Sequence, residues 1–420
     1  MAENACGLNI WSLAGNEMKI AYVTVAFPFG FQEAFFLPEI RELTAQGHQV
    51  LVVPRSNSGG FVHHTDSWLL EISSNEPILS WNIVKSAILE LLCRPRKSLG
   101  VLSILLRSKG FLTLWKNLLV YPKGLWLARL VRSLGVHHIH AQWASTTSTM
   151  ALVASRVSGI GWSFTAHSGD IAANNLLEEK LRYAAFARFI SQSGIAMAAS
   201  LCPGGLSGKE RLIHMGVDMP PNEPKTETAK PVIVCPAFLL PVKGHQFLFE
   251  SIALLRDRGL RLILELIGDG PLRSELEALG AKLAIGQSVR FLGQIPVEDL
   301  LKLYSTSHVA IVVLPSVDLG SNLCEGIPVS LMEAMSFGIP VISTRTGGIP
   351  ELLGGGAGII VPPEDPVALA NAIESVLRDL GLRSTLAKLG RQRVSSDFNV
   401  RSSMTKLLAC IESLSRQTEA

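Results

Sequence analysis

The chain has 420 residues, is 48% hydrophobic and 17% charged, and carries a formal net charge of +3. That length accommodates two domains of about 200 residues each. No apolar run reaches about 18 residues, which argues against a transmembrane helix, and the small net charge argues against nucleic-acid binding. The six cysteines form no CxxC pair, so neither a zinc site nor a disulfide framework is indicated, and a reducing, cytoplasmic compartment is expected.

The first half predicts a doubly wound α/β domain over residues 18–220. Residues 1–17 lack a basic leader and are expected to be an N-terminal extension rather than a secretory signal. Apolar, β-branched runs predict strands, and apolar residues at helical spacing predict the helices between them. The expected strands are Lys19–Ala26, Gln49–Pro54, Val136–Ala141, Gly161–Ala166, Arg188–Ser191 and Ile213–Asp218. The expected helices include Thr146–Ser158 and Lys180–Ala187.

Residues 76–135 interrupt this pattern with long apolar helical stretches. Nine Lys or Arg and no Asp or Glu occur between Arg94 and Arg132, and Trp115, Tyr121 and Trp126 are interleaved with them. Basic helices with Trp and Leu are typical of surfaces that bind anionic membranes. The alternative is a helical insertion that packs on the domain and leaves its basic side chains solvated.

Polar residues follow two of the predicted strands. Gly30 lies in the loop after the first strand, and His167 and Asp170 follow Gly161–Ala166. Parallel α/β sheets bind ligands at the carboxyl ends of their strands, so these residues are candidates for a binding site. The alternatives are a turn glycine at Gly30 and a structural histidine at His167.

The second half predicts another doubly wound domain over residues 231–395. The Pro- and Glu-rich residues 221–230 are the expected linker, and residues 396–420 are expected to form a C-terminal helix. The expected strands are Val232–Ala237, Leu260–Gly268, Val289–Leu292, His308–Leu314 and Ile359–Val361. Gly268-Asp269-Gly270 is an incomplete dinucleotide fingerprint, so it predicts a tight turn. The fold class is therefore α/β, with two Rossmann-like domains facing a cleft.

Residues 320–351 contain the strongest functional pattern, with two glutamates eight residues apart, Glu325 and Glu333. Pro328 suits the first turn of a helix, so free N–H groups near residues 326–330 favour an anion such as a phosphate. The two carboxylates are placed to accept hydrogen bonds from sugar hydroxyls. The alternative is that Glu333 is a solvated helix residue and Glu325 a loop charge.

The chain resembles the retaining nucleotide-sugar glycosyltransferases of the GT-B fold, in the exopolysaccharide and colanic-acid branch of glycosyltransferase family 4. Glu325–Glu333 matches that family's E-x7-E motif, and Lys243-Gly244-His245 and IGDGPLRSELE match two further segments. In the first domain, HIHAQW, SFTAHSGDI, FIS and HMGVD look like the same branch. The resemblance covers about residues 18–400.

The resemblance implies a role for each matching residue. Lys243 would neutralise the donor diphosphate, Glu325 would hold hydroxyls of the transferred sugar, and His167 would approach that sugar from the first domain. Glu333 would hold the ribose. The remaining donor-side candidates are Gly268, Asp269, Gly326, Ile327 and Pro328, and the acceptor-side candidates are Gly30 and Asp170.

The resemblance also implies the partners. The substrates would be a UDP- or GDP-sugar and a growing polysaccharide or lipid-linked oligosaccharide, at the inner face of the cell membrane. No Asp-x-Asp sequence occurs, so no metal or other cofactor is expected to be required. Gln142 stands where the branch often has His.

One departure concerns the diphosphate. Phe238 stands where the family usually has an arginine that shares the phosphate with the lysine, and Arg345 is a candidate replacement. Weak donor binding or an inactive homologue within an assembly complex is the alternative that this departure raises. A sugar-nucleotide epimerase of the same architecture is a second alternative, and an oxidoreductase is disfavoured because no full GxGxxG follows either first strand.

Overall fold

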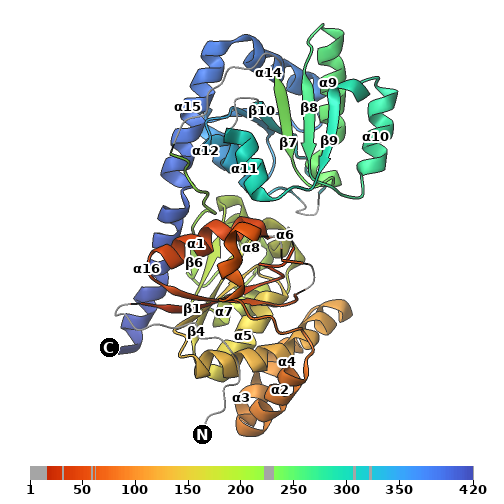
Figure 1. Cartoon of the computed structure of the whole chain (residues 1–420). Coiled ribbons are helices and arrows are strands. Elements are labelled where there is room, and N and C mark those ends of the chain that lie inside the picture. Colours follow the sequence, from red (N-terminus) through yellow and green to blue (C-terminus); the bar gives the residue numbers. More distant parts are fainter. Residues whose placement is uncertain are drawn as a thin grey trace. The chain divides into compact units, whose positions relative to one another are not determined.

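A computed structural model of the chain describes residues 17–30, 33–57, 60–61, 63–221, 231–305, 309–320 and 324–419. Nearly all of the expected extension (1–17) and linker (221–230), together with residues 321–323 of the glutamate-bearing stretch, lies outside the described residues. The chain divides into two compact units (Figure 1). The first contains residues up to 190, 195–213 and 404–420, and the second contains residues 191–194 and 214–403.

The first unit is built on a six-stranded parallel sheet in the order β2-β1-β3-β4-β5-β6. Its strands are β1 (Lys19–Thr24), β2 (Gln49–Pro54), β3 (His138–Gln142), β4 (Gly161–Ala166), β5 (Phe186–Phe189) and β6 (Glu210–Leu212). Helices cover both faces, so most positions of strands β1 to β5 are buried, and residues 20–23 of β1 are fully buried. The strand order reverses between β1 and β3, and the carboxyl ends of these two strands therefore flank the topological switch point, where such sheets bind ligands.

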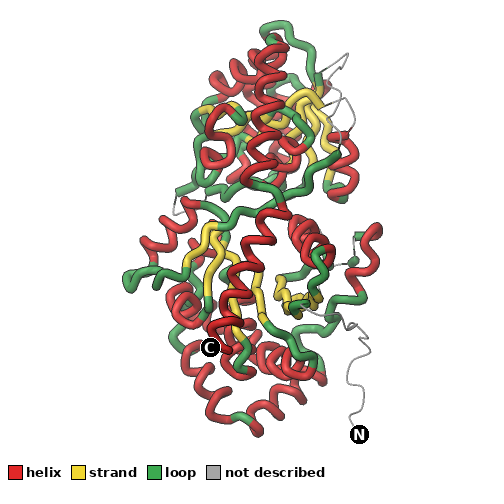
Figure 2. The backbone as a smooth tube through the Cα atoms, turned by 90° about the vertical axis from the view of Figure 1, so that its left-hand side faces the viewer, coloured by secondary structure: helices red, strands yellow, loops and turns green. Residues whose placement is uncertain are grey.

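The helices of the first unit include a set of three that the basic segment forms, α2, α3 and α4, as Figure 2 shows in red. α4 packs on α5 and α2, and α3 packs on α5. The helical elements are η1 (Ala34–Phe36), α1 (Leu37–Ala45), η2 (His64–Leu70), α2 (Trp81–Cys93), α3 (Pro95–Leu105), α4 (Phe111–Ser133), α5 (Thr146–Ser158), α6 (Ser168–Ala173), α7 (Leu177–Tyr183) and α8 (Gln192–Leu201). The last helix, α16 (Val400–Glu419), begins in the second unit and belongs to the first from residue 404 onward.

The second unit repeats the plan with a parallel sheet in the order β12-β11-β10-β7-β8-β9. Its strands are β7 (Val232–Pro236), β8 (Ile263–Ile267), β9 (Val289–Gly293), β10 (Val309–Leu314), β11 (Val341–Thr344) and β12 (Ile359–Val361). Its helical elements are η3 (Pro241–Lys243), α9 (His245–Asp257), α10 (Arg273–Lys282), η4 (Gly286–Ser288), α11 (Val297–Ser305), α12 (Val329–Ser336), α13 (Ile349–Leu353), η5 (Gly354–Gly356), α14 (Pro366–Arg378) and α15 (Leu380–Asp397). The topological switch point of this sheet lies between β7 and β10.

The predicted elements agree with the structure except around residues 180–218. The helix expected over Lys180–Ala187 ends at Tyr183, and the strand expected over Arg188–Ser191 is Phe186–Phe189. The strand expected over Ile213–Asp218 is wrong, because the sheet uses Glu210–Leu212 instead.

Two features of this segment depart from an apolar pattern: the cations Lys180 and Arg188 are buried, and the strand β6 is polar and partly exposed. The ammonium of Lys180 donates to the carbonyl groups of Ala144, Ser145 and Asn175 at 2.6–2.9 Å. Arg188 pairs with Glu39 at 2.7 Å inside the sheet, where both side chains are fully buried. A pattern that assigns charged residues to the surface therefore misplaces the elements that carry them.

Among the described helices, none is both long enough and apolar enough to cross a bilayer.

Candidate active site

Lys243 and Glu325 form an ion pair at the topological switch point of the second unit. Lys243 lies in the loop after β7, and Glu325 lies in the loop after β10, which is the strand beside β7. The Lys243 ammonium donates to Oε2 of Glu325, and the hydroxyl of Ser316 donates to the same oxygen at 3.3 Å. The two side chains are 18% and 16% exposed, so both remain accessible. The topology therefore joins two residues that lie 82 positions apart in the sequence.

The loop that carries Glu325 is held by the two glycines that follow β11. The N–H of Gly348 donates to the carbonyl groups of Glu325 and Gly326 at 3.3 and 3.1 Å. A Cβ atom on Gly347 would lie 1.7 Å from the carbonyl oxygen of Glu325, and Gly347 has a φ of +50°. Only glycine meets both requirements at this position.

Helix α12 begins directly after this loop. We expected Pro328 in the first turn of the helix, but it occupies the position directly before the helix. Its carbonyl accepts hydrogen bonds from the N–H groups of Leu331 and Met332 at 3.2 and 3.3 Å. The N–H groups of Val329 and Ser330 come before the first donors inside the helix and face its start. The helix start thus adds positive partial charge beside the Glu325 loop.

Glu333 lies in the middle of α12 and is buried, with 9% of its surface exposed. The alternative of a solvated helix residue is therefore wrong. Burial raises the pKa of Glu333 to about 8, and the nearby Asp218 carboxylate adds to the shift. The hydroxyl of Tyr304 is also buried and has no hydrogen-bond partner within the described residues.

Gly268 and Asp269 support the loop after β7. The N–H of Ala237 donates to the carbonyl of Ile267 at 2.9 Å, and the N–H of Leu239 donates to the carbonyl of Asp269 at 3.1 Å. A Cβ atom on Gly268 would lie 2.1 Å from the carbonyl oxygen of Ala237. The tight turn therefore fixes the segment that carries Phe238, whose side chain is 38% exposed.

His167 is the first candidate of the other unit and directly follows β4. Its ring accepts a hydrogen bond from the N–H of Asp170, and its Nε2 is buried without a hydrogen-bond partner in the described part of the chain. The accepting nitrogen is therefore Nδ1. Burial lowers the pKa of His167 to about 3, and the Arg188 guanidinium adds to the shift. The ring is neutral, and its proton is on Nε2, which makes that nitrogen a hydrogen-bond donor.

Both carboxylate oxygens of Asp170 accept hydrogen bonds from backbone N–H groups. Its Oδ1 accepts from the N–H of His167 at 2.7 Å, and its Oδ2 accepts from the N–H of Ala144. Burial raises the pKa of Asp170 to about 7, while the N–H of His167 is the largest of several groups that lower it. These contacts give Asp170 a role in holding the loop after β3 to the start of α6, and its binding of an acceptor stays a prediction.

Glu33 is a residue of this region that the sequence did not indicate. Its carboxylate accepts from the N–H groups of Val25, Ala26 and Phe27 at 3.1, 2.6 and 2.8 Å, and from Nε1 of Trp143 at 2.6 Å. It therefore ties the loop after β1 to the residue that follows β3, across the switch point of the first sheet.

Two neighbours complete this end of the first sheet. Gly30 has a φ of +74°, and its N–H donates to the carbonyl of Gly60 at 3.0 Å. Trp143 also has a positive φ, 72°. Trp143 was not among the sequence candidates, and its position directly after β3 is the signal that could have indicated it.

Gln142 points into the sheet rather than to this end. Its Nε2 donates to Glu39 at 3.2 Å, and the hydroxyl of Tyr22 donates to the same carboxylate oxygen at 2.9 Å. Its side chain is fully buried. Gln142 thus contributes to the buried polar contacts around Arg188 and Glu39.

The chain is similar in sequence to known glycosyltransferases. The putative colanic acid biosynthesis glycosyltransferase WcaL of Escherichia coli (strain K12) is 32% identical over 206 residues, which cover 48% of this chain and 50% of that protein. The GDP-mannose-dependent alpha-(1-6)-phosphatidylinositol monomannoside mannosyltransferase of Mycolicibacterium smegmatis is 26% identical over 329 residues, which cover 72% of this chain and 83% of that protein. The match to the first of these relatives thus spans half of its length.

Solved structures match nearly the whole chain. A glycosyltransferase from Rickettsia africae superposes with a TM-score of 0.69 at 16% identity, covering 95% of this chain and 98% of that one. Anabaena Alr3699/HepE in complex with UDP-glucose superposes with a TM-score of 0.68 at 18% identity, covering 95% of this chain and all of the other. These likenesses show that the two Rossmann-like units have the fold of the GT-B glycosyltransferases. The family model "Glycosyl transferases group 1" matches residues 220–393, which contain Lys243, Glu325 and Glu333.

Proposed function

We propose that this protein is a retaining glycosyltransferase that moves a sugar from a UDP- or GDP-sugar to a growing polysaccharide or a lipid-linked oligosaccharide. The observation that carries the proposal is the accessible ion pair of Lys243 and Glu325 at a topological switch point, beside the start of α12. A cation, a helix start and a carboxylate side by side suit a ligand that has both a phosphate and hydroxyl groups.

In this proposal the donor separates Lys243 from Glu325, because its diphosphate binds one of the two residues and its sugar binds the other. The diphosphate binds Lys243 and backbone N–H groups of Gly326, Ile327, Val329 and Ser330. Pro328 has no N–H and shapes the loop before α12. Glu325 accepts from hydroxyls of the sugar. Glu333 accepts from the ribose, and the turn at Gly268 and Asp269 supports the loop beside the diphosphate. Negative charge develops on the departing phosphate, and fixed positive groups stabilise it more strongly in the transition state than in the ground state.

The reaction replaces one bond to the anomeric carbon by another on the same face. The bond to the β-phosphate oxygen breaks, the bond to the acceptor oxygen forms, and the acceptor proton passes to the departing phosphate. His167 contributes from the first unit through Nε2–H, as a hydrogen-bond donor to the transferred sugar, because a neutral ring with Nδ1 occupied does not serve as a base. Gly30 and Asp170 belong to the acceptor side. No metal ion or other cofactor is required, since Lys243 and the helix start supply the positive charge.

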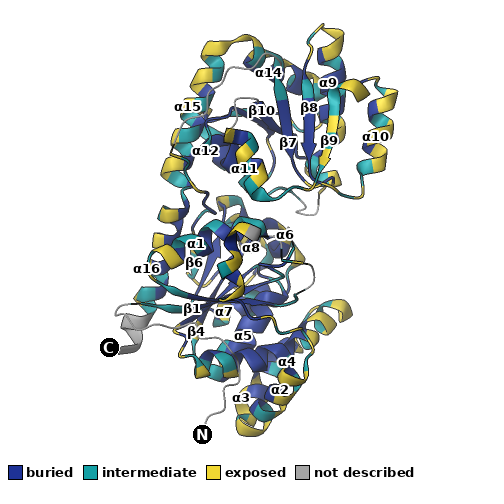
Figure 3. Ribbon diagram, in the orientation of Figure 1, coloured by how far each residue is buried: buried dark blue, intermediate teal, exposed yellow. Residues whose placement is uncertain are grey.

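We also propose that helices α2, α3 and α4 bind the surface of an anionic membrane from its cytoplasmic side. Large apolar side chains are exposed on all three helices, among them Trp81 at 79%, Leu92 at 72% and Phe111 at 76% (Figure 3). They accompany the exposed basic residues of the run between positions 94 and 132, whereas Lys123 of that run is fully buried and Arg132 pairs with Glu90. Apolar side chains that enter the interface and basic side chains that attract anionic headgroups together anchor a protein without a membrane span.

The donor is tested by a thermal-shift screen of UDP- and GDP-sugars, followed by transfer to polyprenyl-linked acceptors and mass analysis of the products. One nucleotide sugar is expected to raise the Tm of the wild-type protein and not that of Lys243→Ala. A product whose anomeric configuration differs from that of the donor would exclude retention. Absence of any stabilising nucleotide sugar would contradict the proposed function.

The membrane surface is tested by sedimentation with anionic vesicles. The protein is expected to sediment with them at low salt and to be released as salt screens the charges. The variant Trp115→Ser/Phe111→Ser should bind more weakly, whereas recovery of the wild-type protein in the supernatant at low salt contradicts this surface.

A further inference from the structure

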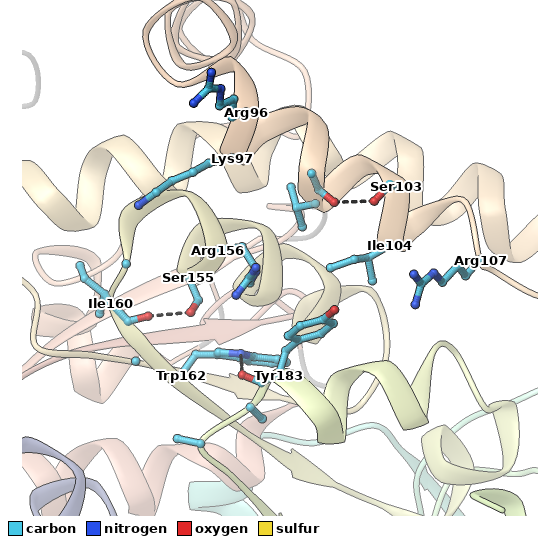
Figure 4. Close-up of a pocket in the computed structure, with 16 residues that line it drawn as sticks. Arg96, Lys97, Ser103, Ile104, Arg107, Ser155, Arg156, Ile160, Trp162 and Tyr183 are labelled. Atoms are coloured by element: carbon cyan, nitrogen blue, oxygen red, sulfur yellow. Dashed lines mark hydrogen bonds between the residues drawn. The ribbon is translucent and has the colours of Figure 1, made fainter. Parts of the chain in front are cut away.

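A basic cavity lies in the first unit at the opposite end of its sheet from His167. It has a volume of about 600 Å³ and is lined by α3, the end of α5, the first residues of β4 and the turn between α7 and β5 (Figure 4). Gly161, at the start of β4, belongs to the lining, and His167 directly follows the last residue of that strand. Six residues of strand span about 20 Å, so this cavity is separate from the candidate active site.

The charged side chains that line this cavity are basic. Arg96, Lys97, Arg107 and Arg156 line it, and no Asp or Glu does so among the residues that the structure describes. In Figure 4, Arg156 lies in the middle, Lys97 and Arg107 reach in from α3 and the residues after it, and Arg96 points away at the outer edge. Glu179 pairs with Arg107 at 2.8 Å, which leaves Lys97 and Arg156 as the cations available to a ligand. An anion therefore fits the cavity.

The floor of the cavity is apolar and firmly built. Val101, Ile104 and Trp162 line it and are buried. The indole Nε1 of Trp162 donates to the carbonyl of Tyr183 at 3.0 Å, and the Arg156 guanidinium lies 4.9 Å from the centre of the Tyr183 ring. A ring beneath the guanidinium holds it in place. Cations above an apolar floor suit an amphiphile, in which a phosphate is joined to hydrocarbon.

The exposed leucines of α3 border the same opening. Leu99 and Leu106 are 56% and 59% exposed and lie seven positions apart, so they share one side of the helix. At about 100° per residue, that side is adjacent to the side of Gly100 and Ser103, which line the cavity. The apolar rim thus continues from the cavity onto the surface that we assign to the membrane.

We propose that this cavity binds the terminal phosphate of an anionic phospholipid headgroup, with Lys97 and Arg156 as the phosphate ligands. A terminal phosphate carries up to two charges and three free oxygens, so it pairs with two cations at once, whereas a phosphodiester carries one charge. The proposal rests on the membrane surface of the preceding section only for the side from which the lipid enters. It does not depend on glycosyl transfer.

The test compares two variants that lose the same charge. Lys97→Gln/Arg156→Gln removes the cavity cations, and Lys85→Gln/Lys116→Gln removes two exposed cations of α2 and α4 that do not line the cavity. Binding is measured by sedimentation with vesicles that contain phosphatidic acid or phosphatidylserine at matched surface charge. Wild type and the control variant are expected to prefer phosphatidic acid by at least about tenfold, and the cavity variant is expected to lose that preference. A melting curve near that of wild type shows that each variant is folded.

Four results separate the possibilities. A preference lost only in the cavity variant supports the proposal. Equal binding to both lipids by the wild-type protein overturns the cavity site and leaves the membrane surface standing, whereas no binding to either vesicle overturns both. Release from phosphatidic acid vesicles by millimolar glycerol 3-phosphate, at constant ionic strength, overturns the lipid assignment, because the ligand is then a soluble phosphate.

Discussion

The indole ring of Trp143 lies against the imidazole ring of His167, with 4.2 Å between the ring centroids. Glu33 holds the indole ring in this position, because its carboxylate accepts a hydrogen bond from the indole N–H at 2.6 Å. The same carboxylate accepts three N–H groups of the loop after β1. The buried Glu33 side chain therefore fixes both the indole ring that lies beside His167 and the loop that leads to Gly30.

Glu33→Gln is expected to weaken this arrangement, because an amide has one acceptor oxygen where the carboxylate has two. The free energy of unfolding should fall by about 2–3 kcal/mol, and kcat should fall while the KM for the donor changes little. Chemical denaturation and transfer kinetics measure the two effects. The exposed Glu71→Gln serves as the control. A donor KM that rises as much as kcat falls would show that Glu33 does not act through the loop and Trp143.

Lys243→Ala and Glu325→Ala are each expected to lower the transfer rate by at least about 10²–10³-fold, since each removes a group that interacts with the reacting part of the donor. The pair is partly exposed, so either variant should lose no more than about 1–2 kcal/mol of stability. Transfer of labelled sugar and thermal melts are the measurements. Lys282→Ala, an exposed change in the same unit, should retain full activity. Wild-type rates in either site variant would contradict the assigned roles.

Gly347→Ala tests whether the glycine turn holds the Glu325 loop. The added Cβ atom would lie 1.7 Å from the carbonyl oxygen of Glu325 at a φ of +50°, so the loop must move. Loss of donor-induced stabilisation and a drop of a few kcal/mol in the free energy of unfolding are expected. Gly354→Ala is the matched control, because its Cβ would meet no atom within 4 Å and its φ is −58°. Equal effects of the two substitutions would exclude a specific role for Gly347.

The sequence predicted most strands of the two sheets because they are apolar runs that can be recognised without their partners, whereas the polar edge strand β6 was missed. It predicted Lys243 and Glu325 as separate candidates, whereas their contact follows from the strand order of the second sheet. Glu33 could not be predicted, because its partners are backbone N–H groups and an indole 110 positions away. The same holds for Lys180, whose charge is satisfied by carbonyl groups that no residue pattern reveals.

Glu333 predicts a specific pH dependence of stability. Its pKa in the folded protein, about 8, lies above the ordinary value of 4.5, so the folded state binds more protons than the unfolded state between these values. The contribution of Glu333 to stability is therefore full below pH 4.5 and is lost as the pH rises through 8. The difference in the free energy of unfolding between Glu333→Gln and wild type should grow in favour of the variant over this range, by at most about 5 kcal/mol. A difference that is independent of pH would contradict the buried, protonated carboxyl.

Phe238 predicts a gain of function rather than a loss. It lies on the loop after β7, five positions before Lys243, where the resemblance to the glycosyltransferase family leads us to expect an arginine. Phe238→Arg places a second cation beside the proposed diphosphate, and one charge-assisted contact to a phosphate should tighten donor binding about tenfold or more. Calorimetric titration with the stabilising nucleotide sugar measures the change. Leu240→Arg is the matched control, because Leu240 belongs to the same loop and both side chains are 38% exposed. If only Phe238→Arg binds the donor more tightly, the result supports a phosphate beside position 238. If both variants bind it more tightly to the same extent, the added net charge of the loop is the cause and the prediction is contradicted.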